Sequence, residues 1–239
     1  MLRFLSILMS IAMLSGCTPG QSENGGNTNA NAVWYNFEKD DAGFTPIFSD
    51  YPDSEGAEEF YELRHEHTDV PIEGAGNGIF ISGNNHSDDL FMGYVKQIDG
   101  FSPNTTYRFD VCFKLATDVD GGMMGIGGAP GEAVSVKCGI VPNEPRSEVN
   151  KAESGNTYRM NIDTGKQRNG GKDMALIGDI SKTMSWYPDQ YEFKDFQTGF
   201  DVTTNERGEV WLIIATDSGF EGTTSYYLDD IIVRWEKAE

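Results

Sequence analysis

Short apolar runs alternate along the chain with turns built from Gly, Pro, Asn and Asp, and few stretches have the spacing of a helix. In many runs every second residue is apolar, which is typical of a strand with one buried face. The pattern predicts an all-β fold with few or short helices, the one helical candidate being 57–62. We expect strands at residues 33–38, 59–67, 78–83, 90–98, 106–116, 123–128, 133–140, 157–163, 174–180, 191–203, 209–216 and 226–235.

One stretch interrupts this pattern: residues 141–156 are polar and contain two prolines. Such a composition is typical of a connection that runs over the surface, so we expect a long exposed excursion between two strands. No second linker-like stretch occurs after residue 32. Roughly two hundred residues without one fit a single large β domain, and 33–239 is predicted to be that domain.

The N-terminal segment predicts export. One Arg precedes an apolar stretch, 4–14, which is too short to span a membrane and is followed by small residues and Cys17. Residues 1–16 therefore have the pattern of a signal peptide. The tetrapeptide 14–17, Leu-Ser-Gly-Cys, resembles the lipobox of bacterial lipoproteins, which implies that Cys17 is lipidated and becomes the mature N-terminus. An ordinary secretory signal that ends near a cysteine is the alternative.

Residues 17–32 are rich in Gly and Asn and predict a flexible tether behind the lipidated cysteine. Thr18, and not Asp, follows Cys17, so the inner-membrane retention signal of some bacteria is absent. The predicted location is the bacterial cell envelope, at the outer membrane or the outer face of the cell membrane, with the lipid as the only contact with the membrane.

Charge narrows the range of partners. The net charge is −20, with 38 acidic and 18 basic residues. Nucleic acids and anionic lipid surfaces are poor partners for such a field. A neutral or cationic ligand, or bound divalent cations, would be compatible with it, and so would the simpler explanation that the acids keep an exported protein soluble.

The last predicted strand places two adjacent carboxylates, Asp229 and Asp230, among aromatic and aliphatic residues. Successive side chains of a strand point to opposite faces, so Asp229 is expected on the face of Tyr227 and Ile231 and Asp230 on the other. Both faces look half-buried. A carboxylate there is costly unless hydrogen bonds or a cation compensate it, so the pattern predicts a partner that the strand itself does not supply.

Three segments of the chain, 34–44, 98–117 and 210–233, resemble in order the opening strand, a loop with its strand and the closing strands of jelly-roll carbohydrate-binding modules and related galactose-binding-like domains. The resemblance implies a jelly-roll β-sandwich of two antiparallel sheets. Its most specific element is the Tyr-x-Leu-Asp-x-Ile pattern at 226–231. The region 141–180 has no counterpart in these modules, so the resemblance does not identify the ligand face.

The same resemblance implies a structural calcium ion. In those modules an Asp at the position of Asp229 is a calcium ligand, together with an acid of the opening strand, here Glu38. Calcium prefers oxygen ligands, which agrees with the demand for a carboxylate partner. Hydrogen bonds from the backbone to Asp229 and Asp230 are the alternative, and they need no metal.

Carbohydrate-binding modules hold sugars by stacking on aromatic rings and by hydrogen bonds from polar side chains. The segment 186–191 offers both, and a proline turn favours exposed rings there. The alternative is that Trp186 closes the edge of the core. The predicted glycan-binding residues are Trp186, Tyr187 and Tyr191 for stacking, with Asp189 and Gln190 for hydrogen bonds.

All three histidines of the chain lie within 65–86. His65 and His67 share one strand face, a spacing that suits a transition metal, and His86 or Asp88 could complete the site. Solvated histidines on an edge strand are the alternative. Cys112 and Cys138 are expected on different faces of their strands, which argues against a disulfide without excluding one.

Enzymatic motifs are missing: there is no Gly-x-Ser-x-Gly and no His-Glu-x-x-His. The sequence therefore favours a non-catalytic, lipid-anchored binding module whose ligand is a glycan. A domain that binds a cell-surface protein or has a structural role is the first alternative. A metal-dependent hydrolase is the second.

Overall fold

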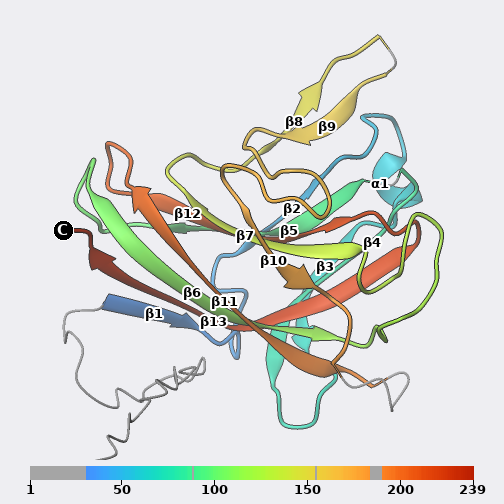
Figure 1. Cartoon of the computed structure of the whole chain (residues 1–239), viewed down its shortest axis with the longest axis horizontal. Coiled ribbons are helices and arrows are strands. Elements are labelled where there is room, and N and C mark those ends of the chain that lie inside the picture. The colour runs from blue at the N-terminus through green and yellow to red at the C-terminus, as the bar shows by residue number, and fades with distance from the viewer. Residues whose placement is uncertain (1–30, 88, 154, 184–189) are drawn as a thin grey trace, which may run out of the picture.

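The computed structural model describes residues 31–87, 89–153, 155–183 and 190–239. Within these ranges two large antiparallel sheets pack face to face (Figure 1). From β4 to β7, and again from β11 to β13, the chain changes sheet at each successive large strand, so neighbours in a sheet are distant in sequence. The predicted jelly-roll β-sandwich is confirmed.

Sheet A has β13 at its centre. On one side β13 pairs with β6, and on the other its two halves pair with β4 and β1. The outer strands are β11 and β3. The strands of sheet A are β1 (Asn31–Tyr35), β3 (Arg64–Asp69), β4 (Asn77–Asn84), β6 (Thr106–Thr117), β11 (Glu192–Thr203) and β13 (Thr223–Lys237).

Sheet B follows the order β10, β7, β12, β5, β2, with every pairing antiparallel. Its central strand, β12, is buried along its whole length. The strands of sheet B are β2 (Thr45–Ser49), β5 (Leu90–Ile98), β7 (Val134–Val141), β10 (Ala175–Asp179) and β12 (Val210–Ser218).

The main core lies between the sheets and follows from the period-two pattern of the strands. In β6 the inward residues include Phe109, Phe113 and Leu115, which are completely buried, and they face Leu212 and Ile214 of β12. Each such side chain contributes about 1.5–3 kcal/mol by leaving water. These alternating positions are the ones that predicted the strands.

The outer face of sheet B is covered by the chain itself. Residues 142–174, the covering segment, fold back over this face and include the hairpin of β8 (Ser147–Asn150) and β9 (Thr157–Met160) (Figure 1). The excursion predicted at 141–156 is exposed over most of its length, including 148–153 and 155–156, and residues 157–174 continue it across the sheet. Beneath the covering segment lies a second apolar cluster made of Ile47, Phe91, Val95, Val141, Met174, Trp211, Ile213 and Ala215, with Met160 and Ile162 packed against it.

Gly139 of β7 lets the covering segment approach the sheet. A Cβ at this position would lie 2.3 Å from the carbonyl oxygen of Asp173 and 3.0 Å from Cγ of Met174. The first distance is far inside van der Waals contact with backbone, so any larger residue would displace the segment. Glycine within a strand often marks such a close approach of another backbone.

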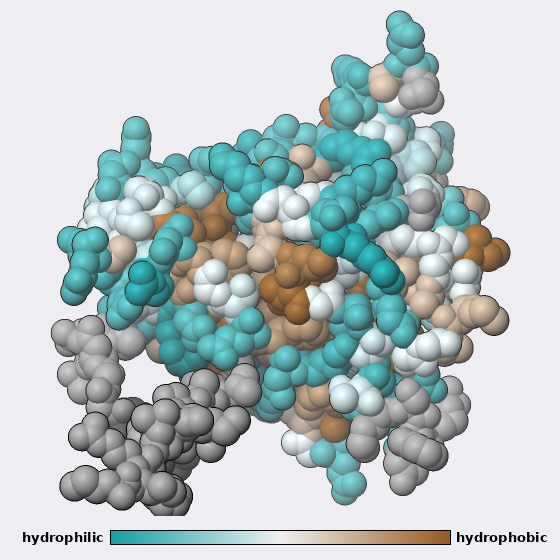
Figure 2. Space-filling view, viewed as in Figure 1, coloured by the Kyte–Doolittle hydropathy of each residue, from teal (hydrophilic) through white to brown (hydrophobic). Residues whose placement is uncertain are grey.

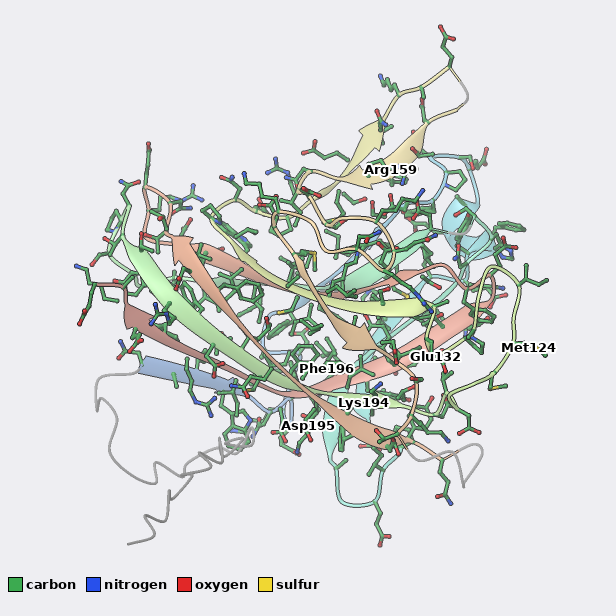
Figure 3. The ribbon with its side chains drawn as sticks, in the orientation of Figure 1. Met124, Glu132, Arg159, Lys194, Asp195 and Phe196 are labelled. Carbon is green, nitrogen blue, oxygen red and sulfur yellow. The ribbon has the colours of Figure 1, made fainter. Side chains whose placement is uncertain are left out.

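The edge of the sandwich between β10 and β11 is closed by two side chains of β11, Phe196 and Lys194. Phe196 points into the core, and Gly178 of β10 leaves room for its ring. Lys194 reaches the end of β10, where its Nζ donates to the carbonyl oxygens of Asp179, at 2.7 Å, and Ser181, at 2.5 Å. Asp195, the residue between them, points to the opposite side (Figure 3).

β13 does not alternate simply, because it carries a bulge at its two aspartates. Between Asp229 and Ile232 the strand advances three residues while β6 advances two, and Asp230 adopts a φ of 47°. Before the bulge Leu228 faces the core, and after it Ile231 does. The prediction that Tyr227 and Ile231 share a face is thus wrong, since an inserted residue reverses the alternation.

Of the other local predictions, the helix is confirmed and one strand is wrong. The helix α1 (Ala57–Phe60) lies within the predicted range, and in the described part of the chain no helix has the length and apolarity to cross a membrane. The predicted strand at 123–128 is wrong: this stretch is a loop, in which Gly127 has a φ of 73° and Gly128 a φ of 156°. The short strands β2 and β8 were not predicted.

Candidate functional site

Asp230 has two partners on neighbouring strands. Its Oδ2 lies 2.7 Å from Nζ of Lys114 in β6, and its Oδ1 accepts the indole N–H of Trp34 in β1 at 2.9 Å. The amide of Asp230 in turn donates to Oδ1 of Asp229 at 2.7 Å. The predicted partners of the Asp230 carboxylate are therefore the ammonium group of Lys114 and the indole of Trp34. The register of the sheet brings these residues together.

Asp229 is the more buried of the two acids. Burial raises the pKa of its carboxyl group to about 7, and the nearby charges of Asp230 and Glu38 act in the same direction. Glu38 itself is exposed. In the described residues no group of three or more His, Cys, Asp or Glu side chains is placed to hold a metal ion. Calcium takes about six to eight oxygens, so Glu38 and Asp229 would need backbone carbonyls and water as well, and this ion stays a prediction.

The three histidines do not form a metal site in the described residues. His67 places Nε2 2.6 Å from the carbonyl oxygen of Phe37. His86 places Nε2 3.1 Å from the carbonyl oxygen of Phe60 and stacks on its ring at 4.2 Å. His65 is exposed. His86, one of the two expected third ligands, is thus held against the helix, and the other, Asp88, lies outside the described residues, so the transition-metal site stays a prediction.

Neither Cys112 nor Cys138 forms a disulfide, and both are buried. Cys138 belongs to the main core, where burial raises the pKa of its thiol. Cys112 lies on the outer face of sheet A, with Sγ 3.6 Å from Nη1 of Arg234. The two side chains point to different sides of different sheets, as the alternation in their strands indicated.

The predicted glycan-binding cluster is described only in part. Gln190 is exposed, and its carbonyl oxygen accepts Nζ of Lys182 at 3.2 Å. Tyr191 meets Tyr227 edge to face, with ring centroids 5.5 Å apart, and burial raises the pKa of its phenol to about 12. The other three predicted residues, Trp186, Tyr187 and Asp189, lie outside the described residues.

Tyr191 belongs to an aromatic row on the outer face of sheet A. Tyr227 also contacts Phe80, at 4.9 Å and an angle of 51°. Phe193 continues the row across Ala116, under Nζ of Lys114. The rings are half-buried and inclined to each other, so they do not make the flat platform on which a sugar stacks best.

A cleft of about 1020 Å³, here the edge cleft, opens at the side of the sandwich. It exists because β10 pairs with β7 only as far as Cys138, whereas β11 continues to Thr203. The end of β7, the end of β11 and the covering segment form its walls. On the face shown in Figure 2, apolar surface lies between polar margins over the strip that separates β7 and β10 from β11.

The floor of the edge cleft is apolar and its rim is polar. Ile140, Val141, Phe200, Val202 and Trp211 form the floor, and of these Phe200 is half-buried while Trp211 is buried. The rim carries exposed amide, carboxylate and cationic groups. These are Asn143, Glu144, Arg146, Asn161, Lys172, Asp201 and Arg207.

Sequence reasoning missed the edge cleft. One signal was available: the run Val-Trp-Leu-Ile-Ile at 210–214 is apolar at every position, which indicates a strand buried on both faces. A second cover was therefore required, and the polar residues 142–174 were the candidate. Their place relative to β11 depends on tertiary contacts that no local pattern records.

Comparison with known proteins gives a likeness in fold. No protein family and no curated protein matches the sequence. Similar solved structures include the CBM22-1–GH10 modules of Clostridium thermocellum xylanase 10B with xylohexaose, at 12% identity and a TM-score of 0.40, covering 87% of this chain and 28% of that one. TmCBM61 with β-1,4-galactotriose has 8% identity, a TM-score of 0.35 and coverage of 83% and 90%.

A cyclase from Fischerella sp. TAU, in complex with 4-(1H-indol-3-yl)butan-2-one, is similar to the same degree, with 12% identity, a TM-score of 0.40 and coverage of 85% and 95%. This chain spans less than two thirds of the xylanase chain. Carbohydrate-binding modules and a cyclase are thus similar to this chain at equally low sequence identities and TM-scores. The likeness concerns the fold and does not distinguish one ligand class from another.

Proposed function

We propose that this chain is a lipid-anchored, non-catalytic glycan-binding module of the bacterial cell envelope, with the edge cleft as its binding site. The observation that supports the glycan is the combination of surfaces in that cleft. A sugar ring has an apolar C–H face and a margin of hydroxyl groups, and the cleft has an apolar floor with half-buried Phe200 and a rim of groups that donate and accept hydrogen bonds.

Size and charge agree with this ligand. The cleft volume of about 1020 Å³ lies at the upper end of the roughly 300–1,000 Å³ of small-molecule sites, so it has room for several sugar residues. On the rim Glu144 pairs with Arg146 at 3.3 Å, and Asp201, Asp173, Lys172 and Arg207 also line the cleft, so neither sign of charge dominates. A neutral polar ligand is compatible with such a rim, and it is also compatible with the net charge of −20.

The test uses the full chain carrying Cys17→Ser, which keeps it soluble if the anchor is real. Binding to a panel of soluble polysaccharides is measured by affinity electrophoresis for this protein, for a cleft double variant, Asn143→Ala with Lys172→Ala, and for a matched hairpin double variant, Asn150→Ala with Lys151→Ala. All four residues are exposed, and only the first two line the cleft.

The cleft variant should lose about tenfold or more in affinity, because each hydrogen bond contributes about 0.5–1.5 kcal/mol, and the hairpin variant should bind like the parent. Failure of the parent to bind any polysaccharide would overturn the glycan proposal. Loss of binding on Trp34→Ala, with the cleft variant unaffected, would move the site to the outer face of sheet A, where Trp34 is 48% exposed.

A protein partner is the second candidate, and one observation favours it. The loop between β6 and β7 exposes three large apolar side chains, Met123, Met124 and Ile126, with Met124 98% exposed (Figure 3). Exposed apolar residues gathered in one loop often mark a contact with another protein. If Met124→Ser with Ile126→Ser leaves glycan binding intact but dissociates a self-associated form in sedimentation, the loop serves protein contact separately from the edge cleft.

A further inference from the structure

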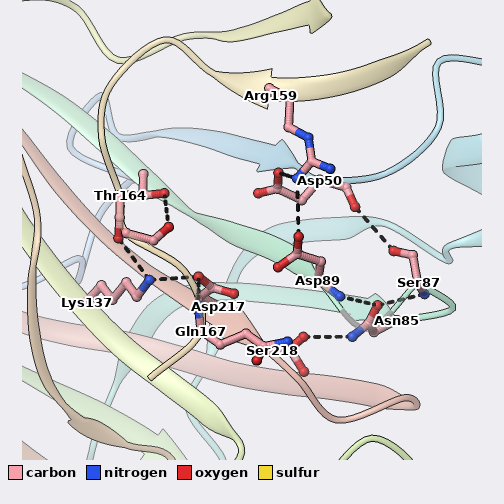
Figure 4. A network of polar contacts seen from close by, with 11 residues as sticks. Asp50, Asn85, Ser87, Asp89, Lys137, Arg159, Thr164, Gln167, Asp217 and Ser218 are labelled. Atoms are coloured by element: carbon pink, nitrogen blue, oxygen red, sulfur yellow. Dashed lines mark hydrogen bonds and ion pairs between the residues drawn. The ribbon is translucent and has the colours of Figure 1, made fainter. Parts of the chain in front are cut away.

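A second hollow, of about 310 Å³, lies under the covering segment at the other end of sheet B; it is called here the acid cavity. Its polar wall comes from strand ends that are far apart in sequence: Asp50 after β2, Asp89 before β5 and Asp217 in β12. Arg159 of β9 closes it from above (Figure 4). None of these residues lines the edge cleft.

Asp217 lines this cavity, and one of its two carboxylate oxygens has no hydrogen-bond partner among the described residues. Its side chain is only 5% exposed, and its Oδ2 accepts Nζ of Lys137 and the amide of Gln167, both at 2.7 Å. The other oxygen, Oδ1, is buried without a hydrogen-bond partner among the described residues. A buried carboxylate oxygen left in this way costs about 1–3 kcal/mol, so the fold provides an acceptor for a group that is not part of the protein.

Arg159 holds the other two acids together. Its Nη1 donates to Oδ1 of Asp50 and, at 3.2 Å, to Oδ2 of Asp89. Burial raises the pKa of Asp50 to about 6 in spite of Arg159, and the charges of Asp89 and Asp217 contribute to this rise. Donor and acceptor groups thus stand next to each other along the polar wall, and both remain within reach of the cavity that they line.

The charges argue against a metal ion. Asp50, Asp89 and Asp217 are accompanied by two cations, Lys137 and Arg159, which already contact all three carboxylates. A divalent ion would be placed beside these two positive groups, and in the described residues no set of three acidic or histidine ligands is arranged for one. A neutral group that donates one hydrogen bond and accepts another meets the wall without this repulsion.

The rest of the lining is mixed. Asp163, Thr164, Gly165 and Lys166 of the covering segment contribute polar groups, and Met160 and Ile162 of the same segment are its apolar members. Ile162 also lines the edge cleft, so the two hollows share this residue. We propose that the acid cavity binds a single neutral sugar unit, with a hydroxyl group donating to Oδ1 of Asp217, its neighbour exchanging hydrogen bonds with Asp89 and Arg159, and the C–H face of the ring against Met160 and Ile162.

This inference extends the proposed glycan function to a second, separate site. The probes are free neutral monosaccharides (glucose, galactose, mannose, xylose and N-acetylglucosamine), with methylammonium and calcium ions as competitors of different chemistry. The readouts are calorimetry and the backbone amide resonance of Gln167 in ¹H–¹⁵N spectra. That amide reports on the site because it donates to Oδ2 of Asp217.

At least one monosaccharide should bind with a ratio of one to one and shift the Gln167 amide. Asp89→Asn and Arg159→Lys should each weaken it by about tenfold, since each removes a charge-assisted hydrogen bond of the wall. Arg64→Lys is the control, because Arg64 is exposed on β3 in the other sheet. Asp217 is not substituted, because it is the ion-pair partner of the buried Lys137. Thermal melts verify that every variant is folded.

The results separate the two sites. If polysaccharides bind through the edge cleft but no monosaccharide shifts the Gln167 amide, the acid cavity proposal is wrong and the glycan function stands. If monosaccharides bind with the expected variant effects while no polysaccharide binds, the acid cavity proposal stands and the proposal that the edge cleft binds glycans is wrong. A shift of Gln167 produced by methylammonium or calcium and by no sugar would also overturn the proposal, as would equal affinity in all three variants.

Discussion

The buried ion pair between Lys137 and Asp217 gives the sharpest test of the structure. The lysine side chain is completely buried, its Nζ lies 2.7 Å from Oδ2 of Asp217, and it also donates to the carbonyl oxygen of Thr164 at 2.8 Å. The substitution Lys137→Met keeps the length of the side chain and removes the charge. It leaves Asp217 buried with the amide of Gln167 as its remaining donor.

Removing one partner of a buried pair costs about 3–5 kcal/mol, because the other charge is left in a medium that solvates it poorly. For a domain of this length each kcal/mol lowers the melting temperature by about 2–4 °C, so we expect a decrease of roughly 6–20 °C. Lys114→Met is the matched control. Its Nζ also lies 2.7 Å from a carboxylate, that of Asp230, but the two side chains are 31% and 23% exposed, and the expected cost is about 1 kcal/mol or less.

The cost should also depend on pH. Burial raises the pKa of Asp217 above its ordinary value in the wild type, and loss of Lys137 raises this pKa further. A carboxyl group whose pKa is higher in the folded state destabilises the fold above that pKa, and the penalty disappears as the pH falls toward the unfolded value of about 3.9. The deficit of Lys137→Met should therefore be smaller at pH 5 than at pH 8.

The assay is chemical denaturation at both pH values, with Lys137→Met combined with Asp217→Leu as a third protein. The double variant should recover most of the loss, because an apolar pair replaces a buried ion pair at little cost. A deficit no larger than that of Lys114→Met would refute the burial of this pair. A deficit that grows on acidification would contradict the assignment of its cause to the Asp217 charge.

Three further predictions concern the anchor, the calcium ion and the covering segment. Cys17→Ser should block lipidation and release or mislocalise the chain without lowering its melting temperature, and unchanged fractionation would contradict lipidation. If Glu38 and Asp229 share a calcium ion, calcium at a hundred times its dissociation constant should stabilise the wild type by about 2.7 kcal/mol over chelator, and Asp229→Asn should abolish this difference; identical wild-type melts would exclude the ion. Gly139→Ala should cost about 1–3 kcal/mol and speed proteolysis within 142–174, whereas Gly121→Ala, whose Cβ would make only ordinary contacts, should do neither.

Much of the sheet structure could be read from the sequence because alternation is a local property. The predicted strand 90–98 coincides with β5, and the predicted helix contains α1. The stretch 123–128 failed because its apolar residues are separated by glycines, and Gly127 takes the left-handed conformation that a strand does not use. β2 and β8 have only five and four residues, which is too short for a period to show.

Contacts between distant strands could not be read in this way. Asp230 demanded a partner, but Lys114 is separated from it by 116 positions and reaches it through the register of β6 and β13. The bulge at Asp229 and Asp230 reverses the alternation that the sequence reading assumed. Two adjacent acids in a strand were a sign of irregular backbone, because Asp is one of the few residues that adopts a positive φ.

Lys137 shows where periodicity stops being informative. It alternates with Val136 and Cys138, so the pattern correctly assigns it to the face opposite the core, and a lysine on such a face is expected in water. The structure buries it completely, because the covering segment converts the outer face of sheet B into an interior. The edge cleft and the acid cavity are both lined by that same segment. The alternation of a strand therefore tells on which face of its sheet a residue lies. The covering segment determines where the outer face of sheet B is buried and where it lines a hollow that can hold a ligand.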